Sequence, residues 1–264
     1  MINVIRAEFR KLRRPTLTLG TLLATLFFSV LFTYLIFSEV KSPQGGGRPG
    51  AVAPTVESIS LANGVVVSFQ QVPVLLGIIA LCIFAAQMAQ EYTYGTLRNL
   101  LVRQPSRMKI LAGKYISMSI FGLLIVAASA ITSIGVSYGL ADWAGVNTTA
   151  WSSAEGTQAI TETLVNVSIA VIIYGTIGMI LGILLRSPIS SIALGVIWFL
   201  ILDNILSGVL SASAKWLPGQ LIDSLTRGGT DSISYDRSAT LLAIYVGISA
   251  LVAAILFKRR DVAN

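Results

Sequence analysis

The sequence predicts an all-α membrane protein with six transmembrane helices. Of its 264 residues, 54% are apolar and only 12% are charged, whereas a soluble chain carries about 25% charged residues. The charges lie between long uncharged runs and are not spread over one surface. A bilayer core of about 30 Å needs roughly 20 helical residues. The composition therefore largely excludes a soluble catalytic domain.

Six uncharged runs define the expected spans. Five are long enough alone, and the fifth in order becomes long enough because it continues past Asp203. We expect the first span to be retained, since its apolar run is too long for a cleaved signal peptide. The spans are expected at about residues 17–37, 66–88, 115–140, 163–185, 188–210 and 238–257 of one transmembrane domain, 1–264.

The basic residues predict the orientation of these spans. The N-terminal segment, the connections after spans two and four, and the C-terminal tail carry 14 of the 19 lysines and arginines. Positively charged flanks stay on the cytoplasmic side, so both termini are expected in the cytoplasm and the chain in the cell membrane. Because the net charge of +7 is clustered beside apolar runs, it does not indicate binding to nucleic acid.

Residues 1–14 predict an amphipathic helix ahead of the first span. At about 100° per residue, its apolar residues share one narrow arc and its basic residues fill the other side. Such a helix is expected in the membrane interface, with its basic side near anionic headgroups; a basic flank without helical order is the alternative. The apolar arc comprises Ile2, Ile5, Phe9 and Leu12, and the basic side comprises Arg6, Arg10, Lys11, Arg13 and Arg14.

The cytoplasmic connection at 91–110 holds the most informative pattern. Leu97, Leu100 and Leu101 are spaced i, i+3 and i+4, so a short helix here has one apolar face. Gly95 can begin this helix, and Pro105 ends it. Leucines exposed to the cytosol need a cover, which is lipid, another part of the chain or a partner protein.

The same connection contains, in order, Glu91, Gly95, Thr96, Leu97, Leu100, Leu101, Pro105, Arg107 and Lys114. This pattern resembles the loop between the second and third spans of permease subunits of ATP-binding-cassette (ABC) exporters of the second integral-membrane type. The basic N-terminal segment, the six spans and the ending 257–262 are similar to that family too. The resemblance implies a coupling helix that docks onto a separate ATPase subunit, with the residues from Glu91 to Arg107 as its contacts. It also implies a second permease copy or a paralogue.

Asp203 is the one carboxylate well inside an apolar region, where charges are costly and commonly functional. It lies 17 residues after Arg186, or about 25 Å along a helix, and so near the external boundary. Solvation at that boundary and a role in the substrate path both remain open.

For the external segment 211–237, the resemblance implies short outer or re-entrant helices, which Pro218 and Gly219 would break. A loop lying on the membrane is the alternative.

Two further patterns concern packing and membrane anchoring. Two glycine pairs at four-residue spacing permit close helix contact, either within the chain or at a dimer seam. They are Gly135 with Gly139 and Gly178 with Gly182. Three tryptophans just outside the spans are typical of interface anchors. They are Trp143, Trp151 and Trp216.

The missing residue types exclude several classes of chemistry. There is no histidine, and Cys82 is the only cysteine, which excludes serine–histidine triads and Cys/His zinc sites. No phosphate-binding loop pattern occurs either. We therefore expect no catalytic, cofactor or metal site in this chain, with ATP and magnesium on a partner ATPase.

The expected function is the permease subunit of an ATP-driven exporter. One alternative is an ion- or proton-driven carrier, although such carriers usually place several ionisable or unwound elements at the bilayer midplane. Another is a membrane sensor or assembly protein that does not transport.

Overall fold

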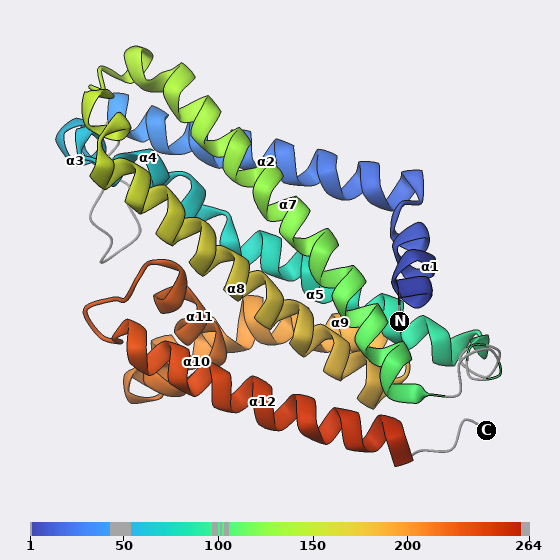
Figure 1. Cartoon of the computed structure of the whole chain (residues 1–264). Helices are drawn as coiled ribbons and strands as arrows, with labels where there is room; N and C mark the ends of the chain where they lie inside the picture. The colour runs from blue at the N-terminus through green and yellow to red at the C-terminus, as the bar shows by residue number, and fades with distance from the viewer. Residues whose placement is uncertain (1, 43–53, 97–99, 101, 103–105, 260–264) are drawn as a thin grey trace.

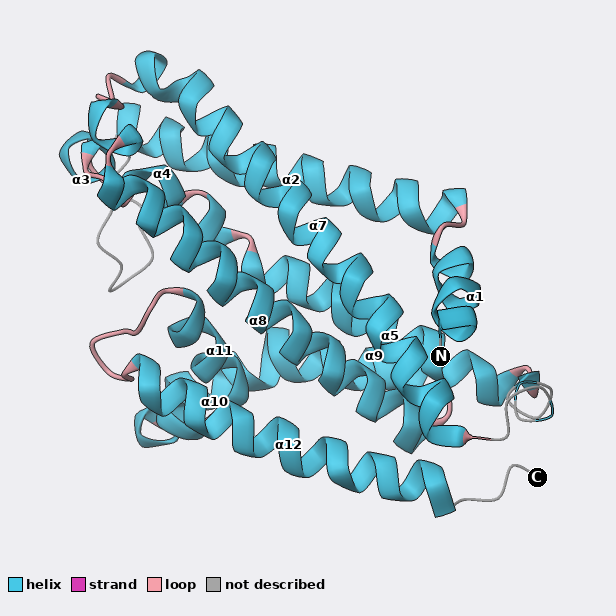
Figure 2. Ribbon diagram, viewed as in Figure 1, coloured by secondary structure: helices cyan, strands magenta, loops and turns pink. Residues whose placement is uncertain are grey.

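The computed structural model describes residues 2–42, 54–96, 100, 102 and 106–259. Its regular elements are helices, and the described part of the chain contains no strand (Figure 2). Six helical segments are long and apolar enough to cross a membrane, which confirms the all-α class and the six expected spans. The segments are Pro15–Lys41, Gly64–Thr93, Arg107–Ala144, Ala154–Leu185, Pro188–Val209 and Tyr235–Lys258.

The long helices run side by side between two ends (Figure 1). They are α2 (Pro15–Lys41), α4 (Gly64–Val67) with α5 (Pro73–Thr93), α7 (Arg107–Ala144), α8 (Ala154–Leu185), α9 (Pro188–Ile197) with α10 (Asp203–Val209), and α12 (Tyr235–Arg259). We call one end the terminus end: it holds α1 (Ile2–Leu12), the end of α5, the start of α7 and the end of α12. The opposite end holds α3 (Val56–Ser60), η2 (Thr149–Ser152) and α11 (Pro218–Thr226).

The pair of helices α5 and α8 forms the centre of the bundle. In the most apolar stretch of the second and fourth spans 61% of the residues are buried, against 17% in the first, fifth and sixth. A Cβ at Gly178 would lie 2.3 Å from the Leu81 carbonyl oxygen, and one at Gly182 would lie 2.8 Å from that of Ala85. Glycine is therefore required there, and this pair forms a seam within the chain. A Cβ at Gly135 would meet nothing.

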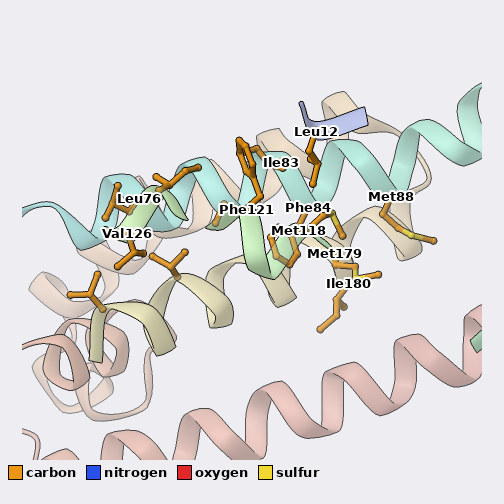
Figure 3. Packing of buried hydrophobic residues seen from close by; sticks show 14 of the residues in the cluster. Leu12, Leu76, Ile83, Phe84, Met88, Met118, Phe121, Val126, Met179 and Ile180 are labelled. Atoms are coloured by element: carbon orange, nitrogen blue, oxygen red, sulfur yellow. The ribbon is translucent and has the colours of Figure 1, made fainter. Parts of the chain in front are cut away.

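The main hydrophobic core fills the space between α5, α7 and α8 (Figure 3). Leu12 of α1 reaches the same cluster as Ile83 and Met118, and it is fully buried. The N-terminal helix is therefore anchored to the bundle through its last turn. It is also tied to α7 by the Ser117 hydroxyl, which donates to the Ile5 carbonyl at 3.1 Å, and by Val4, which lies against Gly113.

The structure corrects the expected interface role of Trp151. Its side chain is only 1% exposed, and its indole nitrogen donates to the Ile59 carbonyl at 2.8 Å. The reason is that η2 folds back onto α3, so the ring fills a small core at the opposite end. Trp143 and Trp216 are exposed, as an anchor in the interface would be.

The segment 211–237 folds as a pair of short helices, η4 (Ser211–Trp216) and α11, with the break at Leu217. Pro218 is the first residue of α11, so the helix pair is interrupted at the position where Pro218 and Gly219 predicted a break. The helix buries Leu221, Ile222 and Leu225 in a cluster with α8 and α12. The segment is therefore part of the bundle and not a loop lying on its surface.

Candidate functional site

Four charged side chains meet at the terminus end, beside Gly95 and Thr96 at the start of the connection. Glu8 and Lys11 come from α1, Glu91 from the end of α5, and Lys114 from the start of α7. On α1, residues 8 and 11 share one face because they are three apart. We call these four residues the charged tetrad.

The charged tetrad alternates in sign, and each ammonium group contacts both carboxylates. The Lys114 Nζ lies 2.8 Å from Glu8 Oε2 and 2.8 Å from Glu91 Oε1. The Lys11 Nζ lies 3.0 Å from Glu8 Oε1 and 2.8 Å from Glu91 Oε1. The four formal charges cancel, so the tetrad is neutral as a whole.

Burial makes this neutrality important. The side chains of Lys114, Glu8 and Glu91 are between 1% and 6% exposed, while that of Lys11 is 33% exposed at the edge. A buried charge without its partner costs about 3–5 kcal/mol. The tetrad therefore fixes the three helices relative to one another, because any separation leaves a buried charge uncompensated.

Lys11 stays protonated over the physiological pH range. Burial by itself lowers the pKa of Lys11, but the hydrogen bond that Lys11 donates to Glu91 and the charge of Glu8 outweigh it and raise that pKa above its ordinary value. A lysine whose folded-state pKa is raised stabilises the fold fully below its unfolded value. Its contribution is lost only as the pH rises through the folded-state pKa, so Lys11 keeps its positive charge at neutral pH.

The charged tetrad also holds the start of the connection. The Thr96 hydroxyl donates a hydrogen bond to Glu91 Oε2. Between them lies Gly95, whose φ of +64° falls in the left-handed region that favours glycine. Gly95 ends α5 as a helix C-terminus commonly requires, and the chain turns back so that Thr96 reaches the Glu91 carboxylate.

Arg107 joins the same end of the bundle to α12. One guanidinium nitrogen lies 3.2 Å from the Phe257 carbonyl and 3.5 Å from that of Lys258. A basic side chain is favourable at the last carbonyls of a helix. Arg107 therefore fastens the start of α7 to the end of α12.

The expected ATPase contacts take three different positions. Glu91 is buried in the tetrad, so it supports the connection from beneath and does not present its carboxylate to a partner. Gly95 and Thr96 are exposed, and Leu100 and Arg107 are half-buried. Leu97, Leu101 and Pro105 lie outside the described residues, so the apolar face of the short helix stays a prediction.

The sequence did not predict that three members of the tetrad would form a site with Glu91. These members are Glu8, Lys11 and Lys114. Two signals were available. Glu8 is the one acidic residue in the basic N-terminal segment, and Lys114 stands next to the third uncharged run. Charges beside or inside apolar runs need partners, but the sequence does not show that residues 106 positions apart pair with each other.

Asp203 has a structural task at the opposite end. It is 1% exposed, so solvation at the span boundary does not accommodate its charge. Its carboxylate instead accepts the Gly219 backbone N–H at 2.9 Å and the Gln220 amide at 3.0 Å. Asp203 thus caps the N-terminus of α11, where a negative charge is favoured. Its expected role in a substrate path remains a prediction.

These features define a multi-pass helical membrane protein whose described residues contain no cluster of His, Cys, Asp or Glu able to hold a metal ion. The chain belongs to the family described as "Protein of unknown function (DUF2705)", whose family model matches residues 26–263. It is similar to "Uncharacterized protein YhcI" of Bacillus subtilis (strain 168), with 28% identity over 208 residues. That match covers 72% of this chain and 66% of the relative.

Proposed function

We propose that this chain is the membrane-spanning permease subunit of an ATP-driven ABC exporter. A separate ATPase subunit, which carries ATP and magnesium, binds the connection at 91–110. The chain lies in the cell membrane. Its terminus end faces the cytoplasm, because the basic residues gather there. The motif pattern of the connection, the six spans and the contacts beneath the connection support this proposal.

The charged tetrad is the observation that carries the proposal. A coupling segment can move the membrane spans only if it is joined firmly to them. The tetrad joins α1, α5 and α7 at the base of the connection, and Arg107 adds α12. A displacement of the connection would therefore reach four helices together.

ATP would act through the partner. A partner shifts a conformational equilibrium only by the difference between its affinities for the two states. The nucleotide-bound and nucleotide-free ATPase would hold the connection in two positions. The tetrad would pass this difference to the spans because separating its buried charges is costly.

The N-terminal helix has two faces that fit an interfacial position. Its buried face, with Glu8 and Leu12, belongs to the bundle. Its exposed residues include Arg6, Arg10 and Arg13, which suit the anionic headgroups at a membrane surface. We therefore place α1 in the cytoplasmic interface, fastened to α7 on one side.

A second permease subunit has room beside this chain. The first, fifth and sixth spans bury only 17% of their most apolar stretches. Such apolar faces need either lipid or another helix. A second copy or a paralogue on one of them would complete a path between two permease subunits.

The experiment is co-purification from the native host in mild detergent, with ATP hydrolysis by the captured complex as the readout. Leu100→Asp should still insert but should lose the ATPase, because a charge in a dry contact costs several kcal/mol. The matched control is Leu61→Asp, which changes an exposed leucine at the opposite end. If Leu100→Asp keeps a bound and active ATPase, the coupling assignment is wrong, and the carrier or sensor alternative replaces it.

A further inference from the structure

A cavity of about 460 Å³ lies between α8, α9 and α12. Helix α9 packs mainly against α5 and also against α8, whereas α12 packs against α8 and α11. Contacts between α9 and α12 themselves are few, which leaves a cleft between these two helices. Its walls are almost wholly apolar and include Leu181, Gly195, Trp198, Leu242, Tyr245 and Ser249. A cavity of this size and character is typical of a site for a small apolar ligand.

The fifth span departs from regular α-helical geometry beside this cleft. After Ile197 the helix widens into a π-helical turn, η3 (Trp198–Leu202), and such turns are rare and frequently occur at functional sites. In this turn Phe199 points into the protein, where its ring lies 4.6 Å from that of Tyr174. Gly195 lines the cleft, and a Cβ there would lie 2.7 Å from a methyl carbon of Leu81, so glycine allows α9 to approach α5 closely at the edge of the cleft.

The cleft opens toward the place that hydrocarbon would occupy. Its walls belong to three helices that are apolar and long enough to cross a membrane. Beside it, large apolar side chains of α9 and α12 are exposed, for example Ile197, Ile244 and Ile248. Lipid chains, unlike water-soluble ligands, are present at high concentration at this surface.

Arg237, at the start of α12, is a cation without an acidic partner among the described residues, and it lies on the side of the cleft nearer the opposite end of the bundle. The Arg237 guanidinium carbon lies 4.7 Å from the centroid of the Trp216 ring. Its Nε is buried without a hydrogen-bond partner, and Arg237 has no ion pair within the described part of the chain. The Tyr245 hydroxyl, from the cavity wall, donates to the Trp216 carbonyl at 3.4 Å. The cation site and the cavity are thus adjacent.

The spacing of the two features matches one leaflet of a bilayer. The α12 residues of the cavity, Leu242 to Ser249, follow Arg237 by 5 to 12 positions. That is about 8–18 Å along the helix axis, and half of a hydrocarbon core of about 30 Å is about 15 Å. A headgroup at Arg237 would therefore place an acyl chain alongside the cavity.

We propose that this cleft binds an anionic phospholipid, with its phosphate on Arg237 and one acyl chain in the cavity. Guanidinium groups bind phosphate through paired, charge-assisted hydrogen bonds. The Trp216 ring orients the guanidinium, and the apolar walls take the chain. The assignment is independent of the proposed exporter function, because it concerns the opposite end of the bundle from the charged tetrad.

The test measures how much lipid the purified full-length chain retains, by native mass spectrometry from nanodiscs. Phosphatidylglycerol and phosphatidylcholine with identical acyl chains are supplied in equal amounts. The wild type should retain phosphatidylglycerol preferentially. Arg237→Gln should reduce the retention of phosphatidylglycerol about tenfold, to the level of phosphatidylcholine. The choline group of phosphatidylcholine already cancels the charge of its phosphate, so only phosphatidylglycerol presents a net negative charge to Arg237. Arg227→Gln, an exposed arginine paired with Asp223, is the matched control.

A second variant tests the cavity itself. Ser249→Phe should fill the cleft and lower the retention of both lipids, whereas Ile244→Phe, on an exposed neighbouring position, should not. Equal retention of both lipids by the wild type would overturn the headgroup assignment. If Ser249→Phe retains as much lipid as Ile244→Phe, the cavity holds no acyl chain. If Ser249→Phe instead dissociates a dimer with lipid retention unchanged, a second copy occupies the cleft and the proposal is wrong.

Discussion

Replacing Lys114 by methionine removes one of the two positive charges from the charged tetrad. Methionine keeps most of the side-chain volume but cannot contact Glu8 Oε2 and Glu91 Oε1, both 2.8 Å from the Lys114 Nζ. Lys11 alone then faces two carboxylates, so the buried group carries a net charge of −1. The side chains of Glu8 and Glu91 are at most 6% exposed, so water cannot compensate the missing charge.

The expected loss is about 3–5 kcal/mol, the cost of breaking a buried ion pair on one side. At about 2–4 °C per kcal/mol for a chain of this size, the melting temperature in detergent should fall by about 10 °C. The matched control is Lys109→Met, an exposed lysine on the same helix. A surface change of that kind should stay within about 0.5 kcal/mol.

The double variant Glu8→Gln with Lys114→Met separates charge balance from packing. It leaves a neutral Lys11–Glu91 pair, so it should be more stable than the sum of the two single changes by about 2 kcal/mol, as expected for coupled neighbours. Differential scanning fluorimetry of the four proteins measures this coupling. The charges do not act as one unit if the double variant is only as stable as the sum of the two single changes predicts. The same conclusion holds if Lys114→Met has the same melting temperature as Lys109→Met.

Three further predictions test the topology, the central seam and Asp203. A cysteine at Ser153 should be labelled by an impermeant reagent from outside the cell, whereas one at Ser106 should not; the reverse pattern would overturn the orientation. Gly178→Val should prevent folding, because its Cβ meets the Leu81 carbonyl at 2.3 Å, whereas Gly135→Val should yield normal amounts of protein. Asp203→Asn should insert normally and cost about 1 kcal/mol in a melting assay, since it keeps an acceptor for the α11 amide; an unchanged melting temperature would argue against the cap.

The spans could be predicted because apolar length is a local property of the sequence. Each of the six expected runs lies in one long helical segment of the structure. The close helix contact at Gly178 could also be predicted, since two glycines that are four residues apart permit such contact. The sequence could not decide between a neighbouring helix and a second copy as the partner.

The candidate site was harder to predict because its residues meet only in three dimensions. Amphipathicity predicted the helix that became α1, but an apolar arc does not reveal whether it faces lipid or protein. Leu12 enters the core and Lys11 enters the tetrad, although the pattern placed Lys11 on the basic outer side. Trp151 was misjudged for the same reason: a tryptophan beside a span suits an interface and a small core equally well.

The cancellation of charge in the tetrad has an electrical consequence. Moving one unpaired elementary charge through a membrane potential of 100 mV involves about 2.3 kcal/mol. Two ammonium groups and two carboxylates that move together transfer no net charge, so the membrane voltage does no work on them. The tetrad should therefore add no voltage dependence to a movement in which its four residues shift together, which can be measured by comparing polarised and depolarised vesicles. Lys114→Met would leave one negative charge and make the same movement sensitive to voltage.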